Sequence, residues 1–365
     1  MANCYVDNTN GDDSTGDGSS GSPFKTIQHA FDNFSWSTAG GNAMYLANTS
    51  AFVLSSALTL PSGLTSYDSA SNNNPFVMAG WDNGGSISIT VPNGRTISPA
   101  FEIDGNDTVS VILSLDTANG AFWAFVNGIF HSTTSHAISG SGNEPFRPDF
   151  INCEVYDTGG YYSVSDGGNY IGCYFHGTNN VAFNIGSYLA YGCWLEGFTD
   201  AGMFVITGSA INNVVKDCDA EGIRFGSDGG KIIHNTVDEI TNASAIGINS
   251  VGGSSFGLVL DNIVRNCDGA SAYGYRFQGD TKVEIGNRSY NNTNDAYNGS
   301  YQSDNTTESA DPFTNALGDD YTIDANADSY QSAHSDITPK TATNSGADPA
   351  DAGGGGGETA HTYAS

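Results

Sequence analysis

The chain has very few basic residues. Of its 365 residues only 11 are Lys or Arg, against 40 Asp or Glu, so its formal net charge is −29. Nucleic-acid binding needs clustered Lys and Arg to neutralise phosphates, and this balance argues against it.

Long hydrophobic runs are also missing. No apolar stretch is long enough to insert into a membrane, and the first residues have neither the basic nor the apolar segment of a signal peptide. We therefore expect assembly in the cytoplasm of the producing cell, or secretion if a signal segment has been removed.

Cysteine is scarce, and its spacing excludes the common zinc motif. The six cysteines include no C-x₂-C pair. Cys153, Cys173 and Cys193 recur at one position of a repeat, where neighbouring Cβ atoms would lie ~4.8 Å apart, beyond disulfide reach without distortion. We expect small buried thiols rather than disulfides.

What the chain does contain is a repeated pattern: an apolar residue, a spacer, Cys or Asn, a spacer, and another apolar residue. The marker recurs at spacings of 20, 20, 20, 22, 27 and 25, as Cys153, Cys173, Cys193, Asn213, Asn235, Asn262 and Asn287. A period in the twenties indicates a solenoid, and alternation with period two indicates strands. We predict an all-β, single-stranded right-handed parallel β-helix whose markers stack in one inward column.

The N-terminal segment predicts a cap for this coil. Tyr5-Val-Asp7, a Gly/Asp/Ser loop over residues 8–22 and the segment from Pro23 to Phe31 resemble the N-terminal cap of right-handed β-helix proteins of the pectate lyase-like superfamily. Ser22 as N-cap and an apolar stripe through Phe24, Ile27 and Phe31 predict a short capping helix. The resemblance covers about residues 4–300 and implies three parts: a cap (1–36), a β-helix (37–330) and an extended, low-complexity, Gly-rich tail (331–365).

Ionisable residues form a column three positions after the marker. Glu196, Lys216, Asp238 and Arg265 alternate in sign along it, and one position later Asp217 and Glu239 fall on adjacent rungs, ~5 Å apart, near the spacing of a retaining glycosidase pair. These residues are our candidate catalytic groups: Glu196, Asp217, Asp238, Glu239 and Arg265. The alternative is a solvated ladder of ion pairs with acidic turn residues.

Two further sets of residues are candidates for binding. Tyr174, His176 and Trp194 are predicted to point outward, where large rings mark a subunit interface or a glycan platform. Asp7, Asp12, Asp13 and Asp17 form an oxygen-rich loop that could hold Ca²⁺, although EF-hand spacing is absent. No other cofactor is expected.

The catalytic motifs of the superfamily's enzymes are missing. A galacturonan hydrolase would show Gly-His-Gly and Arg-Ile-Lys, and the nearest strings are His176-Gly177 and Ile223-Arg-Phe225; Arg224 beside Asp219 and Glu221 could mimic a lyase site. The layout, a β-helix with a Gly-rich tail, resembles phage tail-spike and head-fibre proteins.

Two functions follow from these observations. We predict a non-enzymatic phage virion protein, a spike, fibre or capsid-decorating homotrimer that contacts other virion proteins and could bind a host surface glycan. The alternative is a secreted polysaccharide lyase or glycoside hydrolase acting on a surface or extracellular glycan.

Overall fold

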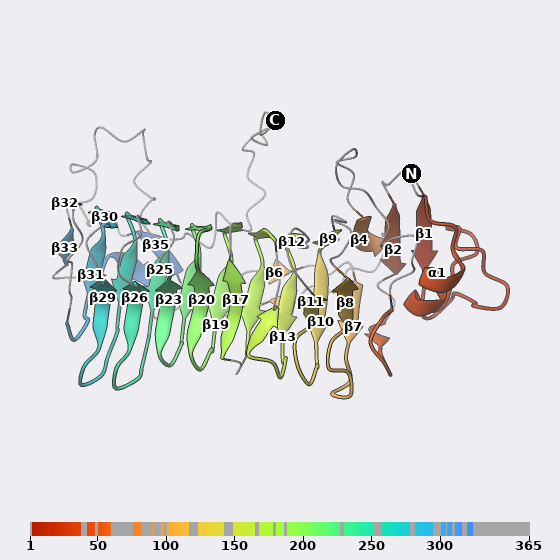
Figure 1. Ribbon diagram of the computed structural model, residues 1–365, viewed down its shortest axis with the longest axis horizontal. Helices are drawn as coiled ribbons and strands as arrows, with labels where there is room; N and C mark the ends of the chain where they lie inside the picture. Colours follow the sequence, from red (N-terminus) through yellow and green to blue (C-terminus); the bar gives the residue numbers. More distant parts are fainter. Residues whose placement is uncertain are drawn as a thin grey trace, which may run out of the picture.

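The chain forms a right-handed parallel β-helix with a short helix at its N-terminal end (Figure 1). This computed structural model describes residues 2–37, 42–47, 50–59, 76–81, 89–90, 96–97, 101–116, 123–141, 149–164, 168–177, 180–185, 188–226, 230–250, 257–277, 282–294, 301–303, 305–308, 311–315 and 320–323. The parallel sheets confirm the predicted fold class, an all-β right-handed parallel β-helix.

Three long parallel sheets of twelve, eleven and eight strands make the walls of the coil, and a complete rung contributes one short strand to each sheet. The twelve-stranded sheet contains β1 (Asn3–Val6), β2 (Ala43–Ala47), β4 (Phe76–Trp81), β9 (Trp123–Val126), β12 (Asp149–Ile151), β15 (Tyr170–Ile171), β18 (Leu189–Tyr191), β21 (Ser209–Ile211), β24 (Lys231–Ile233), β27 (Gly257–Leu260), β30 (Lys282–Ile285) and β32 (Tyr301–Ser303). The eleven-stranded sheet contains β3 (Phe52–Val53), β7 (Phe101–Asp104), β10 (Gly128–His131), β13 (Glu154–Tyr156), β16 (Tyr174–His176), β19 (Trp194–Glu196), β22 (Val214–Lys216), β25 (Thr236–Asp238), β28 (Ile263–Arg265), β31 (Arg288–Tyr290) and β33 (Thr306–Thr307). The eight-stranded sheet contains β8 (Leu113–Asp116), β11 (Ile138–Ser141), β14 (Tyr162–Val164), β17 (Val181–Ile185), β20 (Ala201–Val205), β23 (Glu221–Phe225), β26 (Ile246–Ser250) and β29 (Tyr273–Phe277).

The marker column lies in the sharp turn between the twelve-stranded and eleven-stranded sheets, and its side chains are buried as predicted. Each asparagine side chain accepts from the backbone N–H one rung earlier: the Asn213 N–H donates to Asn235 Oδ1 at 3.0 Å and the Asn235 N–H to Asn262 Oδ1 at 2.8 Å. The ladder runs on through Asn287 to Asn305. Stacked amides thus satisfy backbone donors that the turn would otherwise bury without partners.

The backbone conformation explains which residues occupy the position before each marker, and the repeat alone did not predict it. Asn152, Asn212, His234 and Asp261 adopt φ between 50° and 57°, and glycine occupies the same place at residues 172, 192 and 286. Left-handed backbone favours Gly, Asn and Asp, so the turn selects these residues.

All six cysteines are buried and free. Within the marker column, the Cys153 thiol donates to the carbonyl of Phe125 at 3.3 Å and the Cys173 thiol to that of Phe150 at 3.3 Å. Burial raises the pKa of Cys218, outside this column, to about 12. These thiols act as small buried side chains, as predicted.

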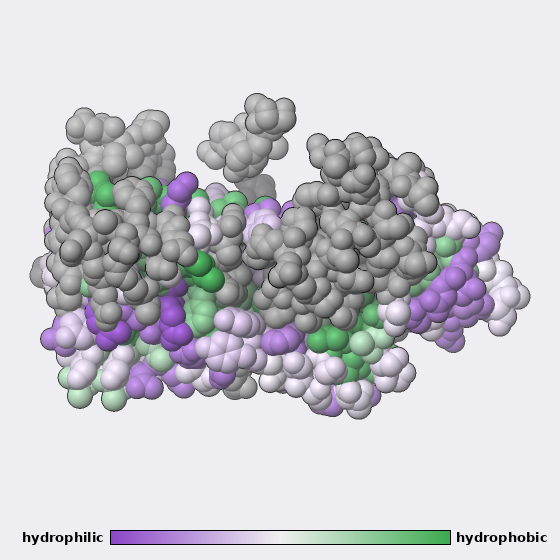
Figure 2. All heavy atoms as spheres, viewed as in Figure 1, coloured by the Kyte–Doolittle hydropathy of each residue, from purple (hydrophilic) through white to green (hydrophobic). Residues whose placement is uncertain are grey.

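The capping helix begins later than the sequence suggested. Helix α1 spans Ile27–Asn33, and Thr26 rather than Ser22 is its N-cap, with Oγ1 accepting from the His29 N–H at 3.2 Å. Pro23 and Phe24 instead belong to the loop, where Phe24 N–H donates to the Tyr5 carbonyl. On the face that Figure 2 shows, a hydrophilic patch lies at this end of the molecule beside side chains of intermediate hydropathy.

Described segments near the C-terminal end fold back on the coil. Strand β34 (Phe313–Asn315) pairs antiparallel with β35 (Asp320–Ile323). A separate small hairpin, earlier in the chain, joins β5 (Ile89–Thr90) and β6 (Thr96–Ile97). The predicted tail, residues 331–365, lies outside the described residues. No helix in the described part of the chain could span a membrane.

Candidate functional site

Two of the predicted catalytic residues, Asp217 and Glu239, lie together in the turn that follows the eleven-stranded sheet. Both have left-handed backbone, with φ of 51° and 54°, which turns their side chains out of the rung. Lys216 Nζ lies 3.8 Å from Asp217 Oδ2 and 3.7 Å from Glu239 Oε2. Burial, reinforced by a hydrogen bond with the Glu239 carboxyl group, raises the pKa of Asp217 to about 6. The Asp217 carboxyl group therefore holds its proton to a higher pH than an ordinary aspartate, with the Glu239 carboxyl group beside it.

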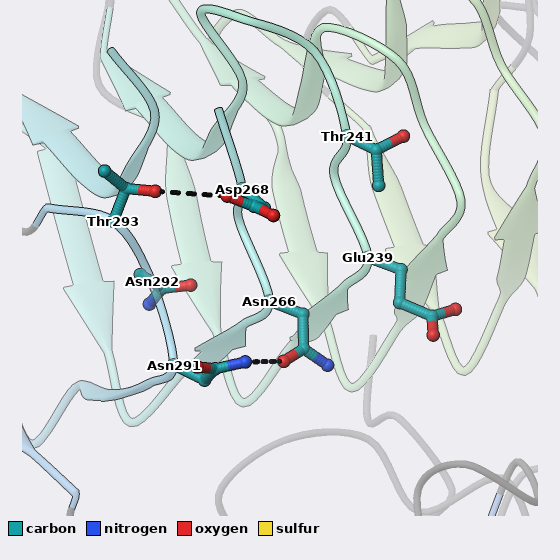
Figure 3. A pocket seen from close by; sticks show the side chains of 7 residues that line it. All are labelled: Glu239, Thr241, Asn266, Asp268, Asn291, Asn292 and Thr293. Atoms are coloured by element: carbon teal, nitrogen blue, oxygen red, sulfur yellow. Dashed lines mark hydrogen bonds between the residues drawn. The ribbon is translucent and has the colours of Figure 1, made fainter. Parts of the chain in front are cut away.

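A polar hollow of about 400 Å³ adjoins this carboxyl pair. Its walls are two rows of side chains from consecutive rungs, Glu239, Asn266 and Asn291 in one row and Thr241, Asp268 and Thr293 in the other, with Asn292 between them (Figure 3). Asn291 Nδ2 donates to Asn266 Oδ1 at 2.8 Å. The lining side chains carry amides, hydroxyls and carboxylates and include no aromatic ring, and such groups suit a polyhydroxylated ligand.

The predicted binding residues come together, but two of them are not exposed. Trp194 Nε1 donates to Glu196 Oε2 at 2.7 Å and the Tyr174 hydroxyl donates to Glu196 Oε1 at 3.0 Å. His176 stacks on Tyr174 at 4.4 Å and its Nε2 lies 2.8 Å from Glu154 Oε1. Tyr174 is 2% exposed and Trp194 1%, so the prediction of exposed rings is wrong.

Asp238 and Arg265 were predicted on a solvent-facing strip, and the structure corrects this. Asp238 Oδ1 lies 3.0 Å from Arg265 Nε, and their side chains are only 1% and 3% exposed. Arg265 Nη1 also donates to Asp311 Oδ2 at 2.7 Å, from the folded-back C-terminal segment. This pair attaches that segment to the coil and is not placed to touch a substrate.

The four N-terminal aspartates do not converge. Asp7 accepts from the backbone of Thr9 and Asn10, and Asp12 from Ser14 and Thr15. Asp13 binds Thr26 and Asp17 accepts from the Ser19 N–H. These carboxylates therefore order the loop, and no group of three His, Cys, Asp or Glu among the described residues is placed to hold a metal ion. Ca²⁺ binding stays a prediction.

A second polar cluster lies on the outer face of the eight-stranded sheet; we call Tyr161, Asp200, Phe204, Glu221, Arg224 and Asn249 the Arg224 cluster. Arg224 Nε donates to Glu221 Oε2 at 2.6 Å and Nη2 to Asp200 Oδ1 at 2.7 Å. Asn249 Nδ2 donates to the other Glu221 oxygen at 2.8 Å. The Arg224 guanidinium lies 4.3 Å over the Phe204 ring.

Strand register creates this cluster, because Phe204, Arg224 and Asn249 are direct neighbours on β20, β23 and β26. Burial lowers the pKa of Arg224, but the hydrogen bond and charge of Glu221 and the charge of Asp200 outweigh it and raise it. Arg224 therefore stays a cation and cannot act as a base. Tyr161 remains 41% exposed and donates to Asp200 Oδ2 at 2.6 Å. An exposed ring beside fixed polar groups can hold a sugar by its face and hydroxyls.

Sequence reasoning noted Arg224 and Glu221 but missed Asp200, Tyr161 and Phe204. Residue 200 lies 24 positions before Arg224, one rung away. Aligning the eight-stranded sheet on its Gly202 and Gly222 positions would have paired these rungs.

The known families and the curated proteins contain no match to this sequence. Among solved structures, the mannuronan C-5 epimerase AlgE4 A-module of Azotobacter vinelandii is 13% identical with a TM-score of 0.48, covering 77% of this chain and 90% of that one. A rhamnogalacturonan lyase is 13% identical with a TM-score of 0.46, covering 79% and 82%. A GH136 lacto-N-biosidase from Eubacterium ramulus is 11% identical with a TM-score of 0.44, covering 84% and 67%. Each is a similarity of backbone shape.

Proposed function

We propose that this protein binds and cleaves a polysaccharide, with Asp217 as the acid and Glu239 as the base. The observation that supports the proposal is the carboxyl pair beside the polar hollow: one carboxyl group keeps its proton to about pH 6 in contact with a second. Cleavage of a sugar chain needs this combination of a proton donor and an acceptor.

The reaction starts from the protonated Asp217 carboxyl group. A glycosidic oxygen would replace the Glu239 oxygen as acceptor, and Asp217 would protonate it as the bond to the leaving sugar breaks. In hydrolysis, the Glu239 carboxylate would take a proton from a water molecule as the water oxygen bonds to the anomeric carbon. In elimination, it would take the proton from the carbon next to a sugar carboxylate, and the electron pair of that C–H bond would form the C=C bond as the leaving sugar departs. The Lys216 ammonium, less than 4 Å from both groups, would stabilise the negative charge left behind.

The Arg224 cluster would hold the same sugar chain. Glu221 follows Asp217 by four residues, so their backbones lie no more than ~14 Å apart. Within the cluster, the Arg224 guanidinium, the Asn249 amide and the exposed Tyr161 ring offer contacts to sugar hydroxyls and to a sugar face. One chain of a few sugars can reach from this cluster to the carboxyl pair.

The test is a panel of neutral and acidic polysaccharides, with new reducing ends reporting hydrolysis and ultraviolet-absorbing unsaturated ends reporting elimination. Asp217→Asn and Glu239→Gln should each lower the rate by about 10²–10⁴-fold. The matched control is Asp219→Asn, an exposed acid of the same turn, which should keep full activity. Unchanged rates in the first two variants, or no cleavage of any glycan by the unaltered protein, would disprove the proposal.

The rate should also depend on pH in one direction. Because Asp217 must carry a proton, and its pKa is about 6, activity should fall tenfold per pH unit above that value. A rate that rises from pH 6 to pH 8 would exclude Asp217 as the acid. The expected virion location, the expected homotrimer and the expected virion partners stay predictions.

A further inference from the structure

The outer face of the twelve-stranded sheet carries a continuous column of apolar side chains, which we call the outer ladder. Its members are direct register neighbours on eight consecutive rungs: Val126, Ile151, Ile171, Tyr191, Ile211, Ile233, Leu260 and Ile285. The labelled strands β4, β9, β12 and β30 of this sheet follow the upper edge of the coil in Figure 1.

The outer ladder points away from the core. The residues that precede its members from Ile151 to Leu260 in the chain are fully buried: Phe150, Tyr170, Ala190, Ala210, Ile232 and Val259. Side chains alternate across a strand, so the ladder itself faces outward. Tyr191 is 46% and Ile171 36% exposed, and the other members are half-buried. A sheet that is apolar on both faces is typical of one covered on both sides.

The charge distribution indicates what covers it. The ladder contains no ionisable side chain apart from the Tyr191 phenol. In the adjoining outward column, Asp149 and Lys231 are charged, whereas Leu189, Ser209, Leu258 and Val283 are uncharged. The chain as a whole has a net charge of −29. Two copies that approached through an acidic face would repel each other, whereas this face lets them meet without burying like charges.

Geometry also favours a second copy. Seven rung steps of ~4.8 Å make a straight row about 34 Å long. Another β-helix of the same rung spacing can match such a row side chain by side chain. The chain's own tail is a poor cover, because residues 331–365 contain only Ile337 and Tyr363 as large apolar residues.

We propose that copies of this chain associate in parallel through the outer ladder, two or three around a common axis. The ladder and its adjoining column lie two residues apart along each strand, so they form a strip of roughly 230 Å² per copy, a little under a third of the ~800 Å² per partner in a standard interface. The flanking turns would supply the remainder. A three-fold axis would give the homotrimer expected from the sequence, through this face rather than through Tyr174 and Trp194.

The first test is the mass of the full chain in solution, measured by size-exclusion chromatography with light scattering. The unaltered protein should be a dimer or trimer at micromolar concentration. Tyr191→Asp and Ile171→Asp should each weaken association by roughly 100-fold. Val53→Asp is the matched control, because Val53 is 60% exposed on β3 of the eleven-stranded sheet and should not alter the mass. A monomeric unaltered protein, or multimers that persist in both ladder variants, would overturn the proposal.

A second measurement does not depend on a destabilising charge. Ile285→Cys lies at one end of the ladder, so only a parallel arrangement brings two copies of it together. Oxidation should therefore produce a cross-linked dimer of Ile285→Cys, whereas Val53→Cys should not cross-link. Failure of Ile285→Cys to cross-link in a multimeric protein would rule out the parallel association.

Discussion

At the scale of single residues, the environment of Asp217 matters more than its identity. Asp217 and Asp219 are both exposed acids of the same turn, but Asp217 lies beside Glu239 and Lys216. The sequence predicted that Asp217 and Glu239 fall on adjacent rungs, because aligning the repeats by their marker residues is enough to show it. It could not predict the raised pKa of Asp217, because that depends on side-chain rotation in a left-handed turn.

Replacing Asp217 should change stability in a pH-dependent way. Its pKa is about 6 in the folded protein against 3.8 ordinarily, so the folded state binds the proton more tightly. The carboxyl group therefore reduces the free energy of unfolding as pH rises from about 4 to 6. Asp217→Asn should melt at a higher temperature than the unaltered protein at pH 8, and at the same temperature at pH 3.5. The gain should stay below ~1 kcal/mol because the side chain is half exposed.

At the scale of elements, the asparagine ladder joins rung to rung. Asn235 Nδ2 donates to the Ala210 carbonyl at 2.9 Å, and its Oδ1 accepts from Asn213 at both the backbone and the side chain. One side chain thus serves the turns of neighbouring rungs.

Asn235→Leu should therefore destabilise the coil strongly. The buried Asn213 N–H and Ala210 carbonyl would lose their partner, at about 1–3 kcal/mol for each group. Denaturant unfolding followed by circular dichroism would measure the loss. Asn242→Leu, in an exposed turn near the same rung, is the control and should change the free energy of unfolding by less than ~0.5 kcal/mol.

The asparagine ladder was predictable from the sequence because its residues repeat. The burial of Asp238 and Arg265, which were predicted to face solvent, was not predictable. Arg265 is 46 residues from Asp311, in a segment without the repeat, and contact between them follows from a fold-back that periodicity does not encode. Tyr174 and Trp194 were placed on the correct face, but their enclosure around Glu196 depends on side-chain packing.

The Asp238–Arg265 pair gives a prediction about this fold-back. Arg265→Met removes the cation from a carboxylate that is 1% exposed and should cost about 3–5 kcal/mol. Asp311→Asn loses an ion pair at a side chain that is 32% exposed and should cost at most ~1 kcal/mol. Equal losses in chemical denaturation would contradict the structural role assigned to the buried pair. The double variant Asp238→Asn with Arg265→Met should recover part of the stability, since no buried charge is left behind.

At the scale of the whole molecule, acidic charge and apolar surface are separated. Acidic residues outnumber basic residues 40 to 11, yet the outer ladder contains none of them along eight rungs. A high net charge favours solubility, and a face without charge would let copies approach without repulsion at their contact. Composition alone gives the first property, and only strand register reveals the second.

This separation predicts how association responds to salt. Copies brought together by apolar contact still repel through their net charge of −29 each. Raising the salt concentration from about 0.01 M to 0.15 M shortens the screening length from about 30 Å to 8 Å. Association should therefore tighten by at least about tenfold, a free-energy gain of ~1.4 kcal/mol, measured by light scattering over a dilution series. An interface built on ion pairs would respond in the opposite direction, so dissociation on adding salt would show that charged side chains, and not the outer ladder, hold the copies together.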